Sequence, residues 1–284
     1  MAVSQFMNSI WQILANRHIN RCRGIVRHLQ WQFRKAFNLF PVELALSDSR
    51  IVATHRRCGV SALVNSQGLY DFNNMSLVKF LLEKGGTFFD VGANIGSYSL
   101  VASEQAPALV VAFEPHPATF GLLADNISLN HRNNTMLVHA AVGESDGYCL
   151  LSNESCSALN KVVSREMQSA VSVPCRRLDS FCRSTGIIPD FIKIDTEGYE
   201  LSVLRSLGDY LARVKIILLE MPAPKSVEAE RIISYLTGWG FQGPYYCDFA
   251  NRNLSRKPFS REDPLFIAWD EMERMKSSAF RFVE

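Results

Sequence analysis

The sequence has no hydrophobic run long enough to cross a bilayer and no pattern of paired cysteines. No apolar stretch reaches about 18 residues, and the N-terminus lacks the short apolar core of a secretory signal. The seven cysteines are odd in number and contain no C-x-x-C pair, which favours scattered reduced thiols over a disulfide framework or a zinc site. We therefore expect a cytoplasmic protein without a membrane-spanning segment.

Acidic residues are missing from the first forty positions. This segment carries six basic residues, namely Arg17, Arg21, Arg23, Arg27, Arg34 and Lys35. Because the whole chain has 30 basic and 28 acidic residues, residues 41–284 hold 24 basic against 28 acidic and are slightly acidic. A main body of this charge offers no broad basic surface, so nucleic acid is not an expected partner.

Residues 5–40 have the apolar periodicity of a helix. Apolar side chains recur at helical spacing, and basic or polar ones mark another face: Cys22, Val26, Leu29, Phe33, Phe37 and Phe40 against Arg23, Arg27, Gln30 and Arg34. Three interpretations stay open, which are a cap packed on the main domain, a basic amphipathic helix on an anionic membrane or a partner, and an organelle transit peptide. We assign residues 1–45 to an N-terminal basic helical extension and residues 46–284 to the main domain.

Short helices and strands are predicted before and after residues 87–100. They are an antiparallel pair at 51–54 and 62–64, a helix through 77–82 capped by Asn73 or Asn74, strands at 109–113, 135–142, 148–151 and 171–175, a helix at 227–236 and a closing hairpin of 241–246 with 264–269. A polar loop at 152–157 is a candidate substrate cover. No repeat or linker-like stretch separates these elements.

The stretch TFFDVGANIGSYSL, residues 87–100, predicts a buried strand, a glycine turn and the start of a helix. Gly92 and Gly96 permit backbone angles and a close ligand approach that a Cβ would obstruct. The spacing G-x-N-x-G differs from the dinucleotide fingerprint G-x-G-x-x-G, and Asp90 stands two residues before the first glycine. A carboxylate there suits a ligand with an ammonium group better than a pyrophosphate.

Four predicted strands end in carboxylates. They are Asp90, Glu114, Asp195 and Glu220, and parallel strands would bring them to one edge of the sheet, which favours a polar ligand there. Glu114 follows Asp90 by 24 residues, about the spacing at which an acid meets the ribose of an adenosine ligand. An acid favoured by a helix dipole is the alternative interpretation of Glu114.

Six segments occur in the order seen in FkbM-type methyltransferases: FFDVGANIGSYSL, VVAFEPHP, VHAAVG, CRRLDSF, FIKIDTEGYE and IILLEM. The chain resembles this family over residues 70–222, and the turn resembles the first motif of class I S-adenosylmethionine-dependent methyltransferases. The resemblance implies an α/β Rossmann-like fold, with a seven-stranded, mostly parallel sheet between helices and an antiparallel final strand. It also implies S-adenosylmethionine as donor, and O-methylation of a hydroxyl on a sugar, glycan or related natural product.

The resemblance also implies roles for individual residues. The donor would be held by Asp90, Gly92, Ala93, Asn94, Gly96, Glu114, Pro115, Ala141 and Asp195, with Glu114 on the ribose and Ala141 beside the adenine. Asp195 and Glu197 would border the methyl group and the acceptor. An alcohol needs its proton removed as the new bond forms, and Asp195, Glu197 and His116 are the candidate bases. Clustered carboxylates could instead bind Mg²⁺, but we expect no metal because no further ligand cluster is evident.

Two rival functions belong to other classes. A nicotinamide-dependent oxidoreductase would need a third glycine in the turn and a hydride-site pair, and neither is evident. A peripheral membrane or scaffold protein could carry an inert methyltransferase-like body. The acids at positions 90, 114 and 195 argue against this alternative, because an inert body would not need them. The expected partner is a small-molecule or glycan acceptor, with membrane contact through the N-terminal helix as a further possibility, and the oligomeric state is unknown from sequence.

Overall fold

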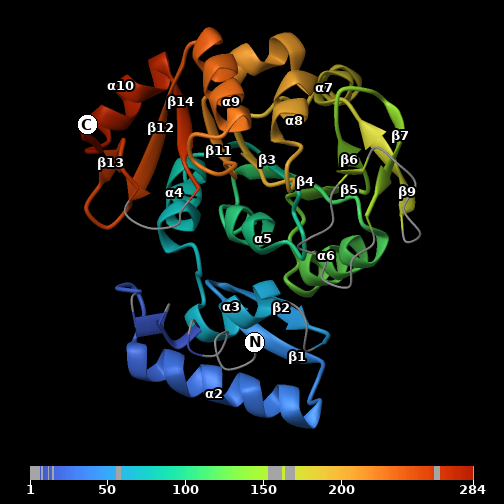
Figure 1. Cartoon of the computed structure of the whole chain (residues 1–284), viewed down its shortest axis with the longest axis vertical. Coiled ribbons are helices and arrows are strands. Elements are labelled where there is room, and N and C mark those ends of the chain that lie inside the picture. The colour runs from blue at the N-terminus through green and yellow to red at the C-terminus, as the bar shows by residue number, and fades with distance from the viewer. Residues whose placement is uncertain are drawn as a thin grey trace. The chain divides into compact units, whose positions relative to one another are not determined.

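The computed structural model describes residues 7, 9–11, 13–14, 16–55, 59–152, 162–163, 170–258 and 263–283. The chain divides into two compact units, Met1–Phe72 and Asn73–Glu284, so the division falls further along the chain than the predicted boundary after residue 45 (Figure 1). The predicted cover loop at 152–157 lies, apart from Ser152, outside the described residues. In the described part of the chain, no helix is both long and apolar enough to cross a membrane.

The N-terminal unit combines helices with a small hairpin. Its elements are helical residues at 7, 9–11 and 13–14, α2 (Arg21–Phe37), the antiparallel strands β1 (Val42–Leu46) and β2 (Ser49–Ala53), and α3 (Gly59–Gln67). The prediction of one helix over 5–40 is wrong, because residues 16–20 interrupt it. The interruption ends at Asn20, whose side chain caps α2 by accepting a hydrogen bond from the Arg23 backbone N–H at 3.0 Å. The predicted strand at 62–64 is also wrong, since these residues lie in α3.

Helix α2 packs on α3 through a narrow face of small and aromatic residues. Gly24, His28 and Trp31 are its buried residues. A Cβ on Gly24 would stand 2.8 Å from Ile13 and 3.3 Å from a backbone oxygen of α3, so the glycine allows the close approach. The Asn65 side chain in α3 donates to the Arg27 carbonyl at 2.8 Å, which fixes the two helices against each other.

The second unit is built on a nine-stranded sheet in the order β15-β13-β12-β14-β11-β10-β3-β4-β5. Its strands are β3 (Gly86–Val91), β4 (Ala108–Phe113), β5 (Thr135–Val138), β10 (Phe191–Ile194), β11 (Ile216–Leu219), β12 (Phe241–Asp248), β13 (Asn253–Ser255), β14 (Leu265–Ala268) and β15 (Arg281–Val283). The five neighbouring strands β11, β10, β3, β4 and β5 are parallel, and β14 runs antiparallel to its neighbours β11 and β12. The predicted seven strands are therefore confirmed, and β13 and β15 extend the sheet beyond them.

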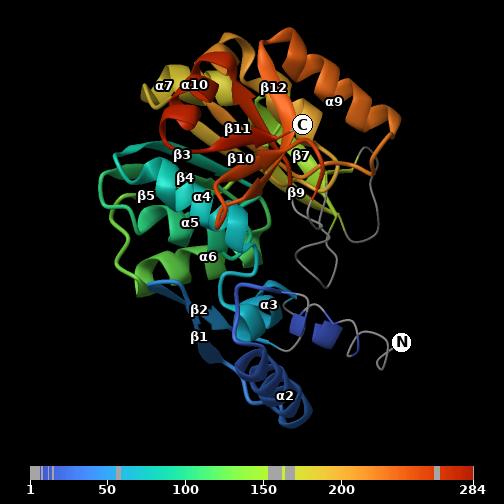
Figure 2. The same cartoon turned by 90° about the vertical axis from the view of Figure 1, so that its left-hand side faces the viewer.

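Helices cover both faces of the large sheet, as predicted. Figure 1 and Figure 2 show α7 (Leu178–Thr185), α8 (Glu200–Ser206) and α9 (Val227–Gly238) on one face, and α4 (Phe72–Leu82), α5 (Ser97–Ser103) and α6 (Pro117–Leu129) on the other. Alternate strand residues such as Phe89, Ile192 and Ile217 form one core cluster with Leu204 and Ile232 of the first group. The intervening strand residues, among them position 90, face the second group of helices.

In this unit one local prediction is wrong, one is confirmed, and one helix was not predicted. The apolar run 135–142 is not one strand, because β5 stays in the large sheet while β6 (Ala141–Val142) joins a second sheet of order β6-β9-β7-β8. Strands β7 (Gly147–Leu151) and β9 (Val171–Arg176) form the predicted antiparallel pair, joined by β8 (Val162–Val163). The segment after β14 forms α10 (Trp269–Ser277), which the sequence did not predict.

Asn73 and Asn74 do not cap α4 but lie buried inside it. The Asn73 side chain accepts a hydrogen bond from the Phe249 N–H at 3.1 Å, and that of Asn74 donates to the Asp263 carbonyl at 3.1 Å. These two residues therefore anchor the C-terminal strands rather than start a helix.

Candidate active site

The glycine turn after β3 is fixed to the end of β4. The N–H groups of Gly92 and Ala93 both donate to the Phe113 carbonyl, at 3.0 and 2.9 Å. Gly92 and Gly96 have φ angles of 79° and 89°, in the left-handed region that favours glycine. A Cβ on Gly92 would stand 1.8 Å from the Asp195 carbonyl oxygen. The protein's own backbone thus requires this glycine, whatever a ligand needs.

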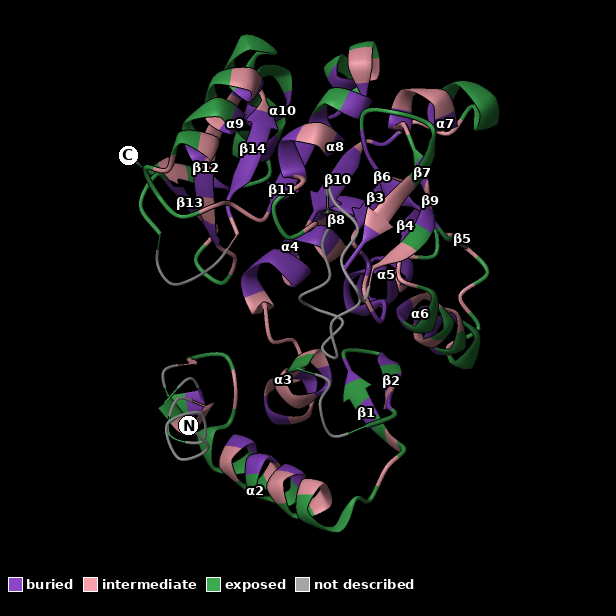
Figure 3. Cartoon of the chain, turned by 45° about the vertical axis from the view of Figure 1, so that its right-hand side comes forward, coloured by how far each residue is buried: buried purple, intermediate pink, exposed green. Residues whose placement is uncertain are grey.

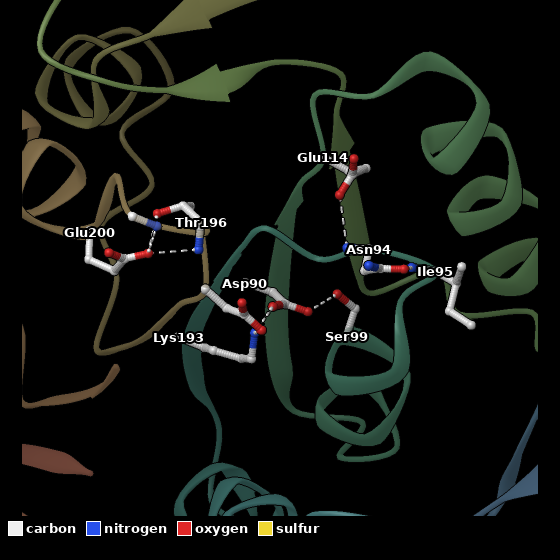
Figure 4. Close-up of polar contacts among 10 residues, drawn as sticks. Asp90, Asn94, Ile95, Ser99, Glu114, Lys193, Thr196 and Glu200 are labelled. Atoms are coloured by element: carbon white, nitrogen blue, oxygen red, sulfur yellow. Dashed lines mark hydrogen bonds and ion pairs between the residues drawn. The ribbon is translucent and has the colours of Figure 1, made fainter. Parts of the chain in front are cut away.

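Asp90 is fully buried, and its neighbour on the adjacent strand is Lys193. The two residues are register partners in β3 and β10, and the Lys193 ammonium lies 3.9 Å from Asp90 Oδ1. The Ser99 hydroxyl donates to the other oxygen, Oδ2, at 2.6 Å (Figure 4). Burial raises the pKa of Asp90, and the charge of Lys193 and the Ser99 hydrogen bond act against this rise.

Lys193 links Asp90 to the carboxylate that follows β10. Its ammonium donates to Asp195 Oδ2 at 2.9 Å and lies 5.0 Å from the centre of the Tyr98 ring. The Lys193 side chain is 6% exposed. Burial alone would raise the pKa of Asp195, but the charge and hydrogen bond of Lys193, with a hydrogen bond from Glu220, lower it. Asp195 is therefore ionised at neutral pH.

Asp195, Glu197 and Glu220 converge at the carboxyl edge of the sheet. Each offers one oxygen within 4.8 Å of the others, and the group is partly open to solvent. Burial, then the charge of Asp195 and the hydrogen bond to it, raise the pKa of Glu220 to about 9. This rise favours the protonated form of Glu220, which can donate a hydrogen bond to Asp195. Three such oxygens could also hold a divalent cation, and the expectation of no metal stays a prediction.

The turn that carries Glu197 is held by Glu200. Glu200 is 2% exposed, and its Oε1 accepts hydrogen bonds from the Thr196 N–H, the Thr196 hydroxyl and the Gly198 N–H at 3.2, 3.1 and 2.8 Å (Figure 4). Glu197 itself is exposed, with a φ of 53° that is unusual for a residue with a Cβ. A buried acid thus positions the exposed acid.

Glu114 follows β4 and lies beside the turn. Its two carboxylate oxygens accept the Asn94 and His116 N–H groups, each at 2.9 Å. Burial raises the pKa of Glu114 to about 7 against the effect of these hydrogen bonds. The Asn94 side chain accepts from the Ile95 N–H at 2.8 Å, which explains how a non-glycine residue holds a φ of 52° there.

The structure brings some predicted residues together and separates others. Asp90 and Asp195 meet at Lys193, and Glu197 lies beside Asp195 in the carboxylate group. His116 instead occupies the N-cap of α6, its ring bonds to Thr119 at 3.3 Å, and it is outside the carboxylate group. The Pro115 carbonyl is bonded to the His139 ring at 3.1 Å, and Ala141 is buried in β6. Sequence reasoning placed Glu220 among the acids at this edge of the sheet without a role of its own, and it assigned no role to Lys193 or Glu200. Lys193 could have been found from its place inside an otherwise apolar strand that Asp195 follows, and Glu200 from its place three residues after Glu197.

Comparisons with known proteins place this geometry in a family. The Methyltransferase FkbM domain matches residues 90–242, which run from Asp90 through the carboxylate group to the start of β12. Hexuronic acid methyltransferase AglP of Haloferax volcanii is 30% identical over 159 residues, which cover 53% of this chain and 64% of that protein. Methyltransferase 1 of Beauveria bassiana is 29% identical over 146 residues, covering 42% of this chain and 57% of that protein. The chain therefore spans less than two thirds of either relative.

Solved structures with a similar arrangement include M. jannaschii TYW2 in complex with AdoMet, at 16% identity, a TM-score of 0.41, and coverage of 80% of this chain and 86% of that one. The family match covers more than half of the 284 residues and includes both motifs that border the site. The chain belongs to the FkbM methyltransferase family.

Proposed function

We propose that this protein is an S-adenosylmethionine-dependent O-methyltransferase whose acceptor is a hydroxyl of a sugar, a glycan or a related natural product. The observation that carries the proposal is the partly open group of Asp195, Glu197 and Glu220 beside the glycine turn. The name of the AglP relative, a hexuronic acid methyltransferase, supports a sugar acceptor.

The residues around the turn fit the donor. Asp90 Oδ1 is buried and has no hydrogen-bond partner among the described residues, and the ammonium of the methionine part would supply one. The holding residues would be Asp90, Gly92, Ala93, Asn94 and Gly96 for the methionine part, Glu114 and Pro115 for the ribose side, Ala141 for the adenine and Asp195 for the region of the sulfonium. When bound, S-adenosylmethionine supplies an electrophilic methyl group.

The carboxylates divide the remaining work. Lys193 and Glu220 hold Asp195 ionised and oriented, so Asp195 can accept a hydrogen bond from an acceptor hydroxyl and fix its direction. Glu197 is the exposed carboxylate on the turn that Glu200 holds, and we assign it the role of the general base that removes the proton of the acceptor hydroxyl. His116 is the weaker candidate, because it lies outside the carboxylate group.

Donor binding is tested by thermal unfolding. S-adenosylhomocysteine should raise the melting temperature of the protein and NAD should not, since a ligand that binds only the folded state stabilises it. Asp90→Asn should weaken S-adenosylhomocysteine binding at least tenfold by calorimetry. A variant that binds as tightly as the parent would remove Asp90 from the donor site.

Proton removal is tested with two substitutions and a control. Asp195→Asn should weaken donor binding and turnover together, while Glu197→Gln should leave donor affinity nearly unchanged. Loss of a general base should lower single-turnover methyl transfer to a hexuronic acid glycoside by roughly 10²–10⁴-fold. Glu228→Gln, a partly exposed residue in the first turn of α9 that pairs with Arg231, is the matched control and should change neither quantity.

Two outcomes would contradict this assignment. Parental turnover of Glu197→Gln would make His116 the next residue to replace. Loss of activity after chelation, with recovery on adding Mg²⁺, would show that the three oxygens hold a cation instead of moving a proton.

A further inference from the structure

Helix α2 has two apolar faces, and only one of them packs within its unit. Gly24, His28 and Trp31 form the buried face toward α3. Val26, Leu29, Phe33 and Phe37, named here the outer stripe, are 52, 51, 57 and 64% exposed. At about 100° per residue the outer stripe lies on the side of the helix opposite the buried face. Figure 3 shows buried and exposed bands alternating along α2.

A second exposed stripe precedes the first. Met7, Trp11 and Leu14 stand at helical spacing and are 57, 72 and 44% exposed, while Ile13 on the other side of these helical residues is fully buried. Eight of the fifteen large apolar side chains that are exposed in the described chain lie between Met7 and Leu39. This concentration is unusual for a soluble surface, where such residues are normally scattered singly.

Basic side chains border the outer stripe along one edge. By helical position, Arg23, Arg27 and Arg34 follow this edge, whereas Arg21 and Lys35 lie nearer the buried face. No acidic residue precedes Glu43. Phe33 and Phe37 contact each other at 4.5 Å between ring centres and form the bulkiest part of the stripe. An apolar stripe bordered by arginines is the pattern of a helix that lies in a membrane interface.

We propose that the outer stripe of α2, with its flanking arginines, binds an anionic lipid surface. A second copy of the chain is a poorer occupant, because it would bring two segments of charge +6 against each other. An anionic bilayer instead complements that charge and takes up the phenylalanines. The proposal concerns the N-terminal unit and does not depend on the reaction assigned to the other unit.

Vesicle sedimentation of the full chain is the direct test. Vesicles of phosphatidylcholine with about 30% phosphatidylglycerol should pellet the protein, vesicles of phosphatidylcholine alone should not, and added salt should weaken the binding. Phe33→Ser with Phe37→Ser should lower affinity about a hundredfold, since burying each ring contributes about tenfold. Arg23→Gln, Arg27→Gln and Arg34→Gln together should lower it by a similar factor, at about fivefold per charge.

The matched control removes two exposed apolar side chains from the other unit. Val227 and Trp269 are 66 and 63% exposed, and Val227→Ser with Trp269→Ser should leave vesicle binding unchanged. Failure of the parent protein to bind anionic vesicles at low salt would overturn the proposal. Binding retained in the phenylalanine variant, or in the arginine variant if the former does not fold, would overturn it as well. If the parent protein binds no vesicles but forms a dimer in solution, and the phenylalanine variant is a monomer, then the outer stripe is an interface between two copies of the chain.

Discussion

Replacement of Gly92 by alanine tests whether the turn is shaped by a ligand or by the protein's own backbone. The new Cβ would stand 1.8 Å from the Asp195 carbonyl oxygen, whereas real Cβ atoms essentially never come closer than 3.0 Å to such an atom. Because that oxygen belongs to the backbone after β10, the ends of β3 and β10 must separate. We expect Gly92→Ala to lower the free energy of unfolding strongly.

The magnitude follows from two contributions. An alanine at a positive φ costs about 1–2 kcal/mol, and forcing an extra group into a packed site costs about 1–3 kcal/mol, so the sum is about 2–5 kcal/mol. Gly186→Ala isolates the first contribution, because Gly186 has a φ of 73° and no atom within 4 Å of the added Cβ. Gly96→Ala should fall between them, since its Cβ meets only the movable Leu123 side chain, at 2.5 Å.

Thermal and urea unfolding of the three variants provide the measurement. For a unit of this size, about 1 kcal/mol shifts the melting temperature by about 2–4 °C, so Gly92→Ala should melt about 10 °C below the parent and Gly186→Ala about 3–4 °C below. If Gly92→Ala is as stable as Gly186→Ala but no longer binds S-adenosylhomocysteine, the ligand and not the backbone requires the glycine.

Three other measurements address the acid beside the turn, the turn itself and the C-terminal strands. Glu114, with a pKa of about 7, should lose its carboxylate on acidification, so S-adenosylhomocysteine affinity should fall about tenfold between pH 8 and pH 6, and Glu114→Gln should flatten that profile. The same raised pKa makes the folded state bind more protons than the unfolded state between about pH 4.5 and 7, so stability from this group declines as pH rises through that window. Glu200→Gln should lower single-turnover rate about tenfold with unchanged donor affinity, because the turn under Glu197 loosens; equal rates would reduce Glu200 to a folding role. The guanidinium of Arg252 lies 4.5, 4.6 and 5.0 Å from the ring centres of Phe80, Phe249 and Phe280, so Arg252→Gln should lower unfolding free energy by about 1–2 kcal/mol in urea, while exposed Arg281→Gln should not.

Buried strands were predictable because their apolar runs are short and end in polar residues. The runs before Asp90, Glu114, Asp195 and Glu220 became β3, β4, β10 and β11 in that way. The antiparallel closing pair was predictable for the same reason. Strands β13 and β15 were not, since three residues give too short a pattern.

Features that depend on partners far away in the chain could not be predicted from the sequence. Asn73 and Asn74 look like caps, but their hydrogen-bond partners stand more than 170 residues away, at positions 249 and 263. The run 135–142 reads as one strand because periodicity does not reveal that the chain leaves one sheet for another after Val138. Within the candidate site, the acids were predictable from strand ends, whereas the buried bond network of Lys193 and Glu200 depends on register and turn geometry.

The pair of Lys193 and Asp90 also bears on how the chain selects its strand alignment during folding. Both residues lie in the middle of a parallel sheet whose neighbouring positions are almost all apolar. A shift of β10 by one residue would turn Lys193 toward Phe89 and the opposite core, and a shift by two would set it beside Phe88. Either misalignment would bury the ammonium of Lys193 and the carboxylate of Asp90 without pairing them, at a cost of several kcal/mol for each charge. Only the observed alignment therefore forms the sheet without an unpaired buried charge.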